Sequence, residues 1–374
     1  MGYDKLTRDT YSSAHRTYVP TRGSATRQAQ EKAYSTGKLH PLVDPAGFEA
    51  VRRSLVRFEQ RSDGLFRVTV GLPVPIEIRL DTTGSMGRNV EEALRILPDT
   101  YDLASRMLPE KDPHMAIGIF GDCMDRFVLC RPQFEMTADK LVHQLTLMVP
   151  EGGGAGNGGE DPQYGLFAGA YLTAAYVNRI GLKGYDFTIT DEPARDYLIR
   201  GELERVFGKD VYDKAAENGH PIDKKDLPST KKVVKDLLKR AHAFVLVVGN
   251  RLDTEAFWPS VIDPRRIVRL PHIGLLPQVQ AAIIGLTEGT LTLRSLDAFL
   301  SDNEVDERDR EAIVRSVANI PIGAQAALDA FGKGPKAGDV FEKKTDLWPM
   351  DPGDVPELVE TEETADATVG PDWL

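Results

Sequence analysis

The segment IEIRLDTTGSMG, residues 76–87, joins a strand-like pattern to a cluster of side chains that carry oxygen. Apolar residues alternate up to Asp81, and Thr83 and Ser85 then follow at every second position. A loop can turn alternate side chains toward one point, and the two glycines of this segment relax the backbone for such a turn. Hard oxygen ligands without Cys or His favour Mg²⁺, Mn²⁺ or Ca²⁺ over zinc. The segment is therefore a candidate site for a divalent cation, with Mg²⁺ as the first choice.

Three further acidic residues follow other predicted strands and loops. Asp191 ends the strand-like segment YDFTITD, and Glu160 and Asp161 close the glycine-rich loop PEGGGAGNGGED. In an open α/β sheet, ligands bind beyond the carboxyl ends of the strands, where the strand order reverses. Two carboxylates about 4 Å apart repel by about 4 kcal/mol at an effective dielectric constant near 20. Three converging carboxylates would therefore need a cation or protonation, and a metal is the simplest answer.

The arrangement of predicted elements sets the fold class. Strand-like and helix-like segments alternate through the middle of the chain. The strand HAFVLVVGN, residues 242–250, is apolar throughout, as is typical of a strand buried on both faces of a parallel sheet. HMAIGIFGD and DRFVLCR are joined by a tight turn and predict an antiparallel hairpin. The fold is expected to be α/β: a doubly wound, Rossmann-like, mostly parallel sheet with one antiparallel edge hairpin, plus irregular N- and C-terminal extensions.

Helices are predicted between these strands in four segments: 89–108, which has a proline in its middle, 137–149, 162–180 and 275–286. Thr137 is the expected cap of the second helix, and Pro162 takes the favoured first position of the third. N-terminal to the sheet, residues 48–72 predict a short helix followed by the strand LFRVTVGL.

The spacing Asp81-x-Thr83-x-Ser85 resembles the Asp-x-Ser/Thr-x-Ser motif of von Willebrand factor A (vWA) domains, whose metal-ion-dependent adhesion site (MIDAS) uses three loops. Asp191 in FTITDEP matches the aspartate that closes the fourth strand of that family, and AIGIFGD with RFVLCRP resembles its edge hairpin. The resemblance covers roughly residues 74–290. It implies that Ser85 binds the ion directly, and that Asp81 and Asp191 bind it directly or through water.

Glu160 departs from the commonest pattern of that family, in which the second loop supplies a threonine six residues before an apolar residue, here Leu166. Three carboxylates around a doubly charged ion leave a net charge of −1. This predicts tighter cation retention and weaker binding of an acidic partner, so the site is structural or favours a basic or neutral contact. Two alternatives stay open. Glu160 points to solvent, or Asp161, one position out of register, serves as a helix N-cap and not as a ligand.

The resemblance and the charge distribution divide the chain into three parts. Residues 1–45 form a basic polar arm, residues 46–300 a vWA-like domain with its core at 74–290, and residues 301–374 an acidic extension. The last part holds 18 acidic and 7 basic residues, which accounts for the net charge of −11 of the whole chain. Family insertions commonly follow the last ligand loop, and the charged, partly helical segment 193–241 fits there. We expect the terminal segments to be disordered.

Other motifs support weaker alternatives. The loop GGGAGNGG lacks the Gly-Lys-Ser/Thr ending of a phosphate-binding loop. A haloacid-dehalogenase-like phosphohydrolase would use Asp81 as its nucleophile and Asp191 to hold Mg²⁺, but Thr83 stands where those enzymes have a second acid. The basic segment KKVVKDLLKR, residues 231–240, has apolar residues at helical spacing. This spacing predicts a packed amphipathic helix in preference to a nucleic-acid-binding site.

Residues around the predicted hairpin turn are assigned structural roles. Asp122 and Asp125 flank the turn and are expected to be turn residues at the opposite end of the sheet from the cation site. Cys123 and Cys130 are expected to be reduced packing residues and not a disulfide. Trp258 is expected in the core, whereas Trp348 and Trp373 lie in polar tail sequence.

These patterns point to an intracellular binding protein. No stretch approaches the roughly 20 uncharged apolar residues that cross a bilayer, and the N-terminus has no apolar signal segment. We expect a cytoplasmic protein that binds neither membrane nor nucleic acid. The resemblance implies a metal-dependent protein–protein interaction module and not an enzyme. Family analogy suggests an AAA+ ATPase of the MoxR kind, or a larger complex, as the partner.

Overall fold

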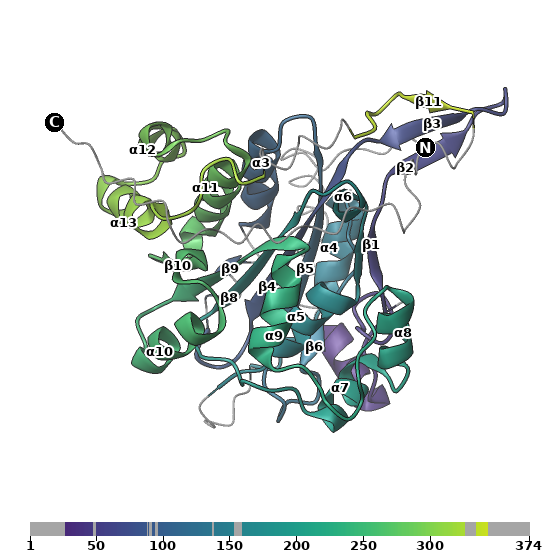
Figure 1. Ribbon diagram of the computed structural model, residues 1–374. Coiled ribbons are helices and arrows are strands. Elements are labelled where there is room, and N and C mark those ends of the chain that lie inside the picture. The colour runs from purple at the N-terminus through teal and green to yellow at the C-terminus, as the bar shows by residue number, and fades with distance from the viewer. Residues whose placement is uncertain are drawn as a thin grey trace.

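A six-stranded sheet forms the centre of the protein (Figure 1). The structure, a computed structural model, describes residues 27–47, 50–87, 89, 92–93, 96–136, 138–152, 159–325 and 334–342. The strand order is β10 (Ile267–Leu270), β9 (Ala241–Val248), β8 (Gly184–Thr190), β4 (Pro73–Asp81), β5 (Asp112–Phe120) and β6 (Leu129–Cys130). Neighbouring strands are parallel except β5 and β6, which are antiparallel. The predicted doubly wound, mostly parallel sheet with one antiparallel edge pair is confirmed.

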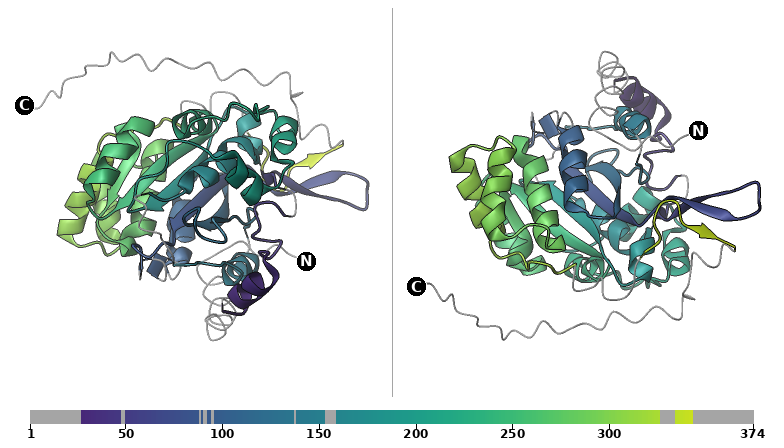
Figure 2. Two further views of the ribbon diagram at one scale, coloured as in Figure 1. Left: turned by 90° about the horizontal axis from the view of Figure 1, so that it is seen from below. Right: turned by 90° about the horizontal axis from the view of Figure 1, so that it is seen from above.

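Helices cover both faces of the sheet, and each face has its own apolar core. The two layers are seen in Figures 1 and 2. One core includes α3 (Leu97–Met107), α4 (Ala138–Thr146) and α11 (Leu276–Glu288), and α11 packs on α3. The other includes α5 (Pro162–Tyr171), α9 (Thr230–Leu238) and α10 (Leu252–Val261), with α5 packed on α9. Trp258 of α10 is fully buried there.

The central strand β4 presents different chemistry to the two layers. Four apolar side chains face the α3 and α11 core: Val74, Ile76, Ile78 and Leu80. The alternate residues Glu77 and Arg79 are equally buried on the α5 side. Arg79 pairs with Asp186 of β8 and lies 3.3 Å from Glu77, and Arg131 donates to Glu77 at 2.8 Å. This pairing is what makes burial of the charges tolerable, since an unpaired buried ion costs several kcal/mol.

The segment before β4 is extended where a helix was expected. β1 (Arg52–Ser54) pairs with β7 (Thr173–Ala175), and β2 (Arg57–Gln60) pairs with β3 (Phe66–Val70). The prediction of a short helix in this region is therefore wrong for residues 52–60, while the following strand is confirmed. Contacts distant in sequence decide the outcome, because the Arg52 amide donates to Leu172 and its side chain donates to three carbonyl oxygens: Asp44, Gly47 and Arg131.

A three-stranded antiparallel sheet of β2, β3 and β11 (Val340–Phe341) projects from the body of the protein in Figures 1 and 2. Two predicted helices also differ from the sequence pattern. α3 begins at Leu97, so its proline lies in the first turn and not in the middle. The segment 162–180 divides into α5, β7 and α6 (Tyr176–Arg179), with Pro162 in the first turn as expected. The expected cap Thr137 lies outside the described residues.

The segment 193–241 contains α7 (Arg200–Phe207), α8 (Val211–Glu217) and α9 between β8 and β9. The amphipathic packing predicted for 231–240 is confirmed, because Val233, Val234 and Leu237 of α9 are buried. Beyond α11 lie α12 (Leu293–Asp302) and α13 (Glu307–Val317), which buries Ile313 and Val317.

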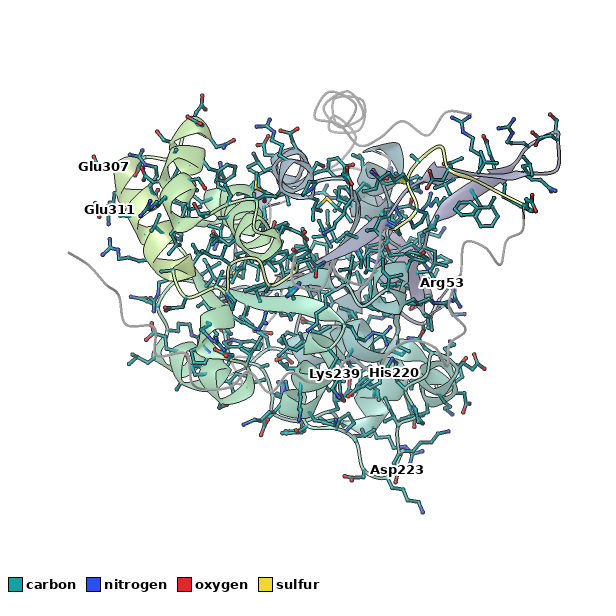
Figure 3. The ribbon with its side chains drawn as sticks, turned by 45° about the horizontal axis from the view of Figure 1, so that its top comes forward. Arg53, His220, Asp223, Lys239, Glu307 and Glu311 are labelled. Carbon is teal, nitrogen blue, oxygen red and sulfur yellow. The ribbon has the colours of Figure 1, made fainter. Side chains whose placement is uncertain are left out.

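Glu307 and Glu311 lie on the outer side of α13 (Figure 3). Trp348 and Trp373 lie outside the described residues, as do 343–374 as a whole. Among the described residues, no helix combines the length and apolar character that spanning a membrane requires.

Candidate metal site

The predicted site lies where the strand order of the sheet reverses. From the central strand β4 the chain continues to β5 and β6 on one side, and later returns to β8, β9 and β10 on the other. The loops after β4 and β8 therefore leave the sheet in opposite directions, which is the position where open α/β sheets bind ligands. Asp81 is the last residue of β4, and Asp191 directly follows β8. The sheet places both carboxylates at the same rim.

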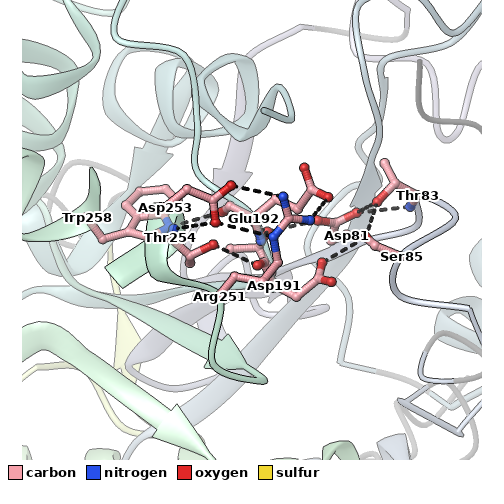
Figure 4. Close-up of polar contacts among 10 residues, drawn as sticks. Asp81, Thr83, Ser85, Asp191, Glu192, Arg251, Asp253, Thr254 and Trp258 are labelled. Atoms are coloured by element: carbon pink, nitrogen blue, oxygen red, sulfur yellow. Dashed lines mark hydrogen bonds and ion pairs between the residues drawn. The ribbon is translucent and has the colours of Figure 1, made fainter. Parts of the chain in front are cut away.

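Hydrogen bonds fix the Asp81 carboxylate from two sides (Figure 4). Its Oδ1 accepts from the amide of Thr83 at 2.9 Å and from the Thr83 hydroxyl at 2.6 Å, and its Oδ2 accepts from the Thr190 hydroxyl at 2.8 Å. Burial raises the pKa of Asp81 to about 6, although these three hydrogen bonds lower it and the charge of Asp191 raises it further. The carboxylate is thus held in one orientation without a neutralising charge.

A chain of hydroxyl groups links Asp81 to Asp191. The Thr83 and Ser85 hydroxyl oxygens are 3.1 Å apart, and Ser85 donates to Asp191 Oδ1 at 2.9 Å (Figure 4). Thr254 of α10 donates to the Asp191 carbonyl at 2.7 Å and anchors the loop from behind. Four of the predicted ligands therefore converge, and all of them offer oxygen: Asp81, Thr83, Ser85 and Asp191.

Glu160, at the end of the glycine-rich loop, lies at the same rim, and hydrogen bonds of its backbone hold it there. The Glu160 amide donates to Pro193 after β8 at 3.0 Å, and the Asp161 amide donates to Gly121 after β5 at 3.1 Å. The Glu160 side chain is only 4% exposed, so it does not point into solvent, and its Oε2 has no hydrogen-bond partner. Burial raises the pKa of Glu160 to about 9, and repulsion from Asp81 is the next contribution. At neutral pH a carboxyl group with this pKa is protonated and uncharged.

A second acidic cluster lies beside the first, at the end of β5. Asp122, Cys123 and Asp161 place potential ligand atoms within 4.8 Å of one another, and such a cluster could hold a metal ion. Arg195, however, already donates to Asp161 at 2.8 Å and to Asp122 at 3.1 Å. Burial and the charge of Asp161 raise the pKa of the Cys123 thiol to about 12, so it is a poor source of thiolate. In this second cluster, Arg195 supplies the positive charge that the carboxylates need.

Two structural predictions about these residues are corrected. Asp122 and Asp125 lie at the same end of the sheet as Asp81, because Asp81 and Phe120 are register partners and the turn follows directly. Asp161 does occupy the N-cap position of α5, but its side chain makes no capping hydrogen bond. Its carboxylate accepts instead from the Cys123 amide, from Gln163 and from Arg195. Cys123 and Cys130 are free thiols, as expected.

Arginines that the sequence motifs do not single out hold these loops together. Arg251, after β9, pairs with Glu192 and with Asp253 (Figure 4). Arg205 of α7 donates to three carbonyl oxygens of the turn after β5: Cys123, Asp125 and Arg126. Arg195 and Arg251 both follow predicted strands, which was the available signal. The acidic partner of each arginine depends on contacts between loops, which the sequence does not reveal.

The donor set suits a hard divalent cation. Its hydroxyl and carboxylate oxygens are the ligands that Mg²⁺, Mn²⁺ and Ca²⁺ prefer. The Oε2 atom of Glu160 has no hydrogen-bond partner, and burial raises the pKa values of Glu160 and Asp81, so both groups favour protonation over an uncompensated buried charge. Asp81, Thr83, Ser85 and Asp191 would hold the ion through their oxygens. The predicted ligand Glu160 is not brought together with Asp81 and Asp191 as a group of three carboxylates within 4.8 Å of one another.

Comparisons with known proteins leave the family open. No family profile matches the chain, and no curated protein does. Two crystal structures of proximal thread matrix protein 1 from the mussel byssus align at 11% identity, with TM-scores of 0.31 and 0.33. The alignments cover 57% of this chain and 48% and 46% of theirs. The pilus adhesin SpaC from Lactobacillus rhamnosus GG aligns at 13% identity, with a TM-score of 0.34, over 62% of this chain and 34% of its own. This chain thus spans about half or less of the structures that it matches.

Proposed function

We propose that this chain is a vWA-like, metal-dependent protein-interaction module with a MIDAS-type site. The observation that carries the proposal is the chain of oxygen ligands from Asp81 through Thr83 and Ser85 to Asp191, at the switch point of the sheet. Such a site positions an ion at the surface, where loops of a partner can reach it. Ser85 is exposed, while Asp81 is buried beneath it.

The surface around the site supports a protein partner. Exposed apolar side chains stand in the segments that follow β5, β8 and β9: Met124 at 71%, Tyr197 at 57%, Ile199 at 40% and, at the first position of α10, Leu252 at 82% exposed. We call these four residues the apolar rim. Half of the large hydrophobic residues that are exposed in the described part of the chain belong to it. Apolar side chains gathered around a polar centre are a common signature of protein–protein contact.

The cation is tested first by its effect on stability. Mg²⁺ bound only to the folded state at about 100 times its Kd should add about 2.7 kcal/mol to the free energy of unfolding. Wild type should show this gain in urea titrations with MgCl₂ against EDTA. Asp81→Asn and Ser85→Ala should lose it, and Ser301→Ala on exposed α12 should keep it. The proposal fails if wild type gains nothing, or if Asp81→Asn gains as much as wild type.

The partner is tested next. We propose an AAA+ ATPase of the MoxR kind or a larger assembly, a choice supported by family analogy alone. Proteins captured from the native host should be released by EDTA, and both Asp81→Asn and the double variant Tyr197→Ser/Ile199→Ser should lose them. Capture that survives chelator and all three substitutions would contradict a metal-dependent interface.

A phosphohydrolase is the competing proposal. It needs an Asp81 oxygen that a phosphoryl group can reach, yet Asp81 is fully buried and both of its oxygens already accept hydrogen bonds. We therefore expect no hydrolysis of p-nitrophenyl phosphate in the presence of Mg²⁺. Turnover that disappears in Asp81→Asn would favour the enzyme instead.

A further inference from the structure

A pocket of about 610 Å³ lies at the opposite end of the sheet from the candidate metal site. Its walls come from the end of α5, from the segment between α8 and α9, and from α9 itself. Arg240, one of the residues that line it, directly precedes β9, whereas Asp191 directly follows the parallel strand β8. The pocket is therefore separate from the proposed interaction site.

Arg240 brings a positive charge to this pocket, and the protein does not neutralise it. Its Nη2 donates to the Thr173 carbonyl at 2.7 Å, its Nη1 contacts Nε2 of His220, and its Nε is buried without an acceptor. In the described part of the chain no carboxylate pairs with Arg240, whereas the buried Arg79 pairs with Asp186. Burial lowers the pKa of Arg240 to about 10, because desolvation penalises its charged form.

His220 adds a hydrogen-bond donor beside this arginine. Burial is the main reason that its pKa is lowered to about 4, and the charge of Arg240 is the next, so the imidazole is neutral at pH 7. A guanidinium can only donate, so Nε2 of His220 accepts in this contact and the ring proton lies on Nδ1. This Nδ1–H has no acceptor among the described residues. The pocket therefore offers a charged and a neutral donor side by side.

The acids of the pocket do not supply the missing countercharge. Three carboxylates line it: Asp223, Asp226 and Asp236. Asp236 is already engaged, because it pairs with Lys232 at 3.0 Å and with Lys239 at 3.3 Å. Asp223 lies apart from His220 and Lys239 in Figure 3. These acids leave Arg240 unpaired, and they would repel a doubly charged ligand more strongly than a singly charged one.

We propose that this pocket binds a monocarboxylate carried on a small apolar body. The carboxylate supplies the countercharge of Arg240, whose planar guanidinium matches its geometry, and accepts from Nδ1–H of His220. The apolar body fits the wall formed by four residues of the α8–α9 segment: Pro221, Ile222, Leu227 and Pro228. The volume of the pocket lies within the range of small-molecule sites.

The first test compares three probes on the full chain by NMR titration: benzoate, its uncharged analogue benzyl alcohol, and inorganic phosphate. EDTA is present throughout, so the outcome does not depend on the proposed metal-dependent function. Wild type should bind benzoate at least about tenfold more tightly than benzyl alcohol, because a charge-assisted hydrogen bond is lost with the alcohol. It should also prefer benzoate to phosphate. Equal binding of benzoate and benzyl alcohol, or tighter binding of phosphate, would overturn the proposal.

The second test locates the carboxylate. Arg240→Lys keeps the charge but removes the planar fork, and it should weaken benzoate binding by about tenfold. Arg294→Lys, on exposed α12, should bind benzoate as wild type does. Urea unfolding checks that both variants are folded. Benzoate affinity that is the same in Arg240→Lys and wild type would contradict the proposal.

A third measurement keeps the proposal falsifiable if Arg240→Lys does not fold. The imidazole Cε1–H resonance of His220, assigned by its absence in His220→Gln, should shift on addition of benzoate to wild type and stay in place on addition of benzyl alcohol. A His220 resonance that does not move at saturating benzoate would show that benzoate binds elsewhere.

Discussion

At the scale of single residues, the candidate site depends on hydroxyl groups as much as on acids. Thr83 donates to one oxygen of Asp81 and Thr190 to the other, so the carboxylate is oriented before any ion arrives. Such supporting hydrogen bonds usually matter for metal affinity nearly as much as the ligands themselves. Thr190 also accepts from the Glu192 amide at 3.0 Å and so stiffens the loop that carries Asp191.

Thr190→Val tests this orientation with almost no change of shape. It should weaken Mg²⁺ binding by about 10-fold or more and lower the free energy of unfolding by about 1 kcal/mol in EDTA, because a buried hydrogen bond is lost. Thr188 offers a matched control two residues earlier on the same face of β8, since its buried hydroxyl has no partner. Thr188→Val should be neutral or slightly stabilising. Isothermal titration and urea unfolding measure both effects, and equal behaviour of the two variants would contradict the role of Thr190.

At the scale of elements, the sequence predicts the sheet well because its signals are local. The apolar run of β9 and the residues at the ends of β4 and β8 are visible in the chain itself. What the sequence hides depends on contacts between distant segments. The alternation of β4 suggests one polar face, and only the structure shows that Arg79 and Asp186 bury each other there.

Two incorrect predictions from the sequence have different causes. Asp122 was assigned to the wrong end of the sheet, although a turn that follows a strand parallel to β4 must lie at the carboxyl end with Asp81. Arg52–Ser54 lacks a strong strand pattern and is extended because it pairs with β7. The ligand residues could be predicted because they follow strands. Their arginine partners could not, because partner choice is set by three-dimensional packing.

The approach of α5 to the sheet provides a prediction about packing. A Cβ at Gly165 would lie 2.3 Å from Cδ of Arg79, which is fully buried and ion-paired and so cannot move aside. Gly165→Ala should destabilise the protein by about 1–3 kcal/mol, the usual result of overpacking. Gly201→Ala is the control, because Gly201 lies in α7 with open space around it. That substitution should stabilise by up to about 1 kcal/mol. Urea unfolding of both variants decides, and a neutral Gly165→Ala would show that α5 can shift.

The loops around the site provide a second prediction at this scale. Arg195→Met leaves Asp122 and Asp161 buried without their cation, which should lower the free energy of unfolding by about 3 kcal/mol or more. Adding Asp122→Asn and Asp161→Asn should recover most of the loss, because no unpaired charge then remains. Arg200→Met, which breaks an exposed and solvent-screened pair with Glu204, should leave stability nearly unchanged. A triple variant no more stable than Arg195→Met would show that shape, not charge, makes Arg195 important.

At the scale of the whole molecule, buried ionisable groups far from the candidate site also make the stability of the fold depend on pH. His114, His220 and His242 lie in different parts of the fold, and burial lowers the pKa of each, to about 3, 4 and 3 respectively. His220 lies near Lys239 in Figure 3, on the α9 side of the protein. The raised pKa values of the buried carboxyl groups act in the opposite direction on acidification. Total stability therefore mixes opposing contributions, and single substitutions are needed to separate them.

His242 is the best residue for that separation, because it lies in β9 far from the cation ligands. It is fully buried in β9, its Nε2 lies 3.0 Å from Oε1 of Gln325, and its ring is 5.5 Å from that of Tyr185. Desolvation is the main cause of its lowered pKa. The hydrogen bond with Gln325 raises the pKa, and the charges of Arg266, Lys183 and Lys111 lower it further. The imidazole is therefore neutral in the folded protein at every pH above about 3.

His242→Gln should expose this contribution as a difference in pH dependence. Below about pH 6.5 the unfolded wild-type chain takes up a proton on His242, and the folded chain does so only near pH 3. Stability supplied by the neutral imidazole is thus complete above pH 6.5 and lost as the pH falls toward 3. The advantage of wild type over His242→Gln should shrink by about 1.4 kcal/mol per pH unit in that window. Urea unfolding in EDTA at pH 8, 6.5, 5.5 and 5 measures the gap. A gap that stays constant with pH would show that His242 takes up its proton at the same pH in the folded and unfolded chains.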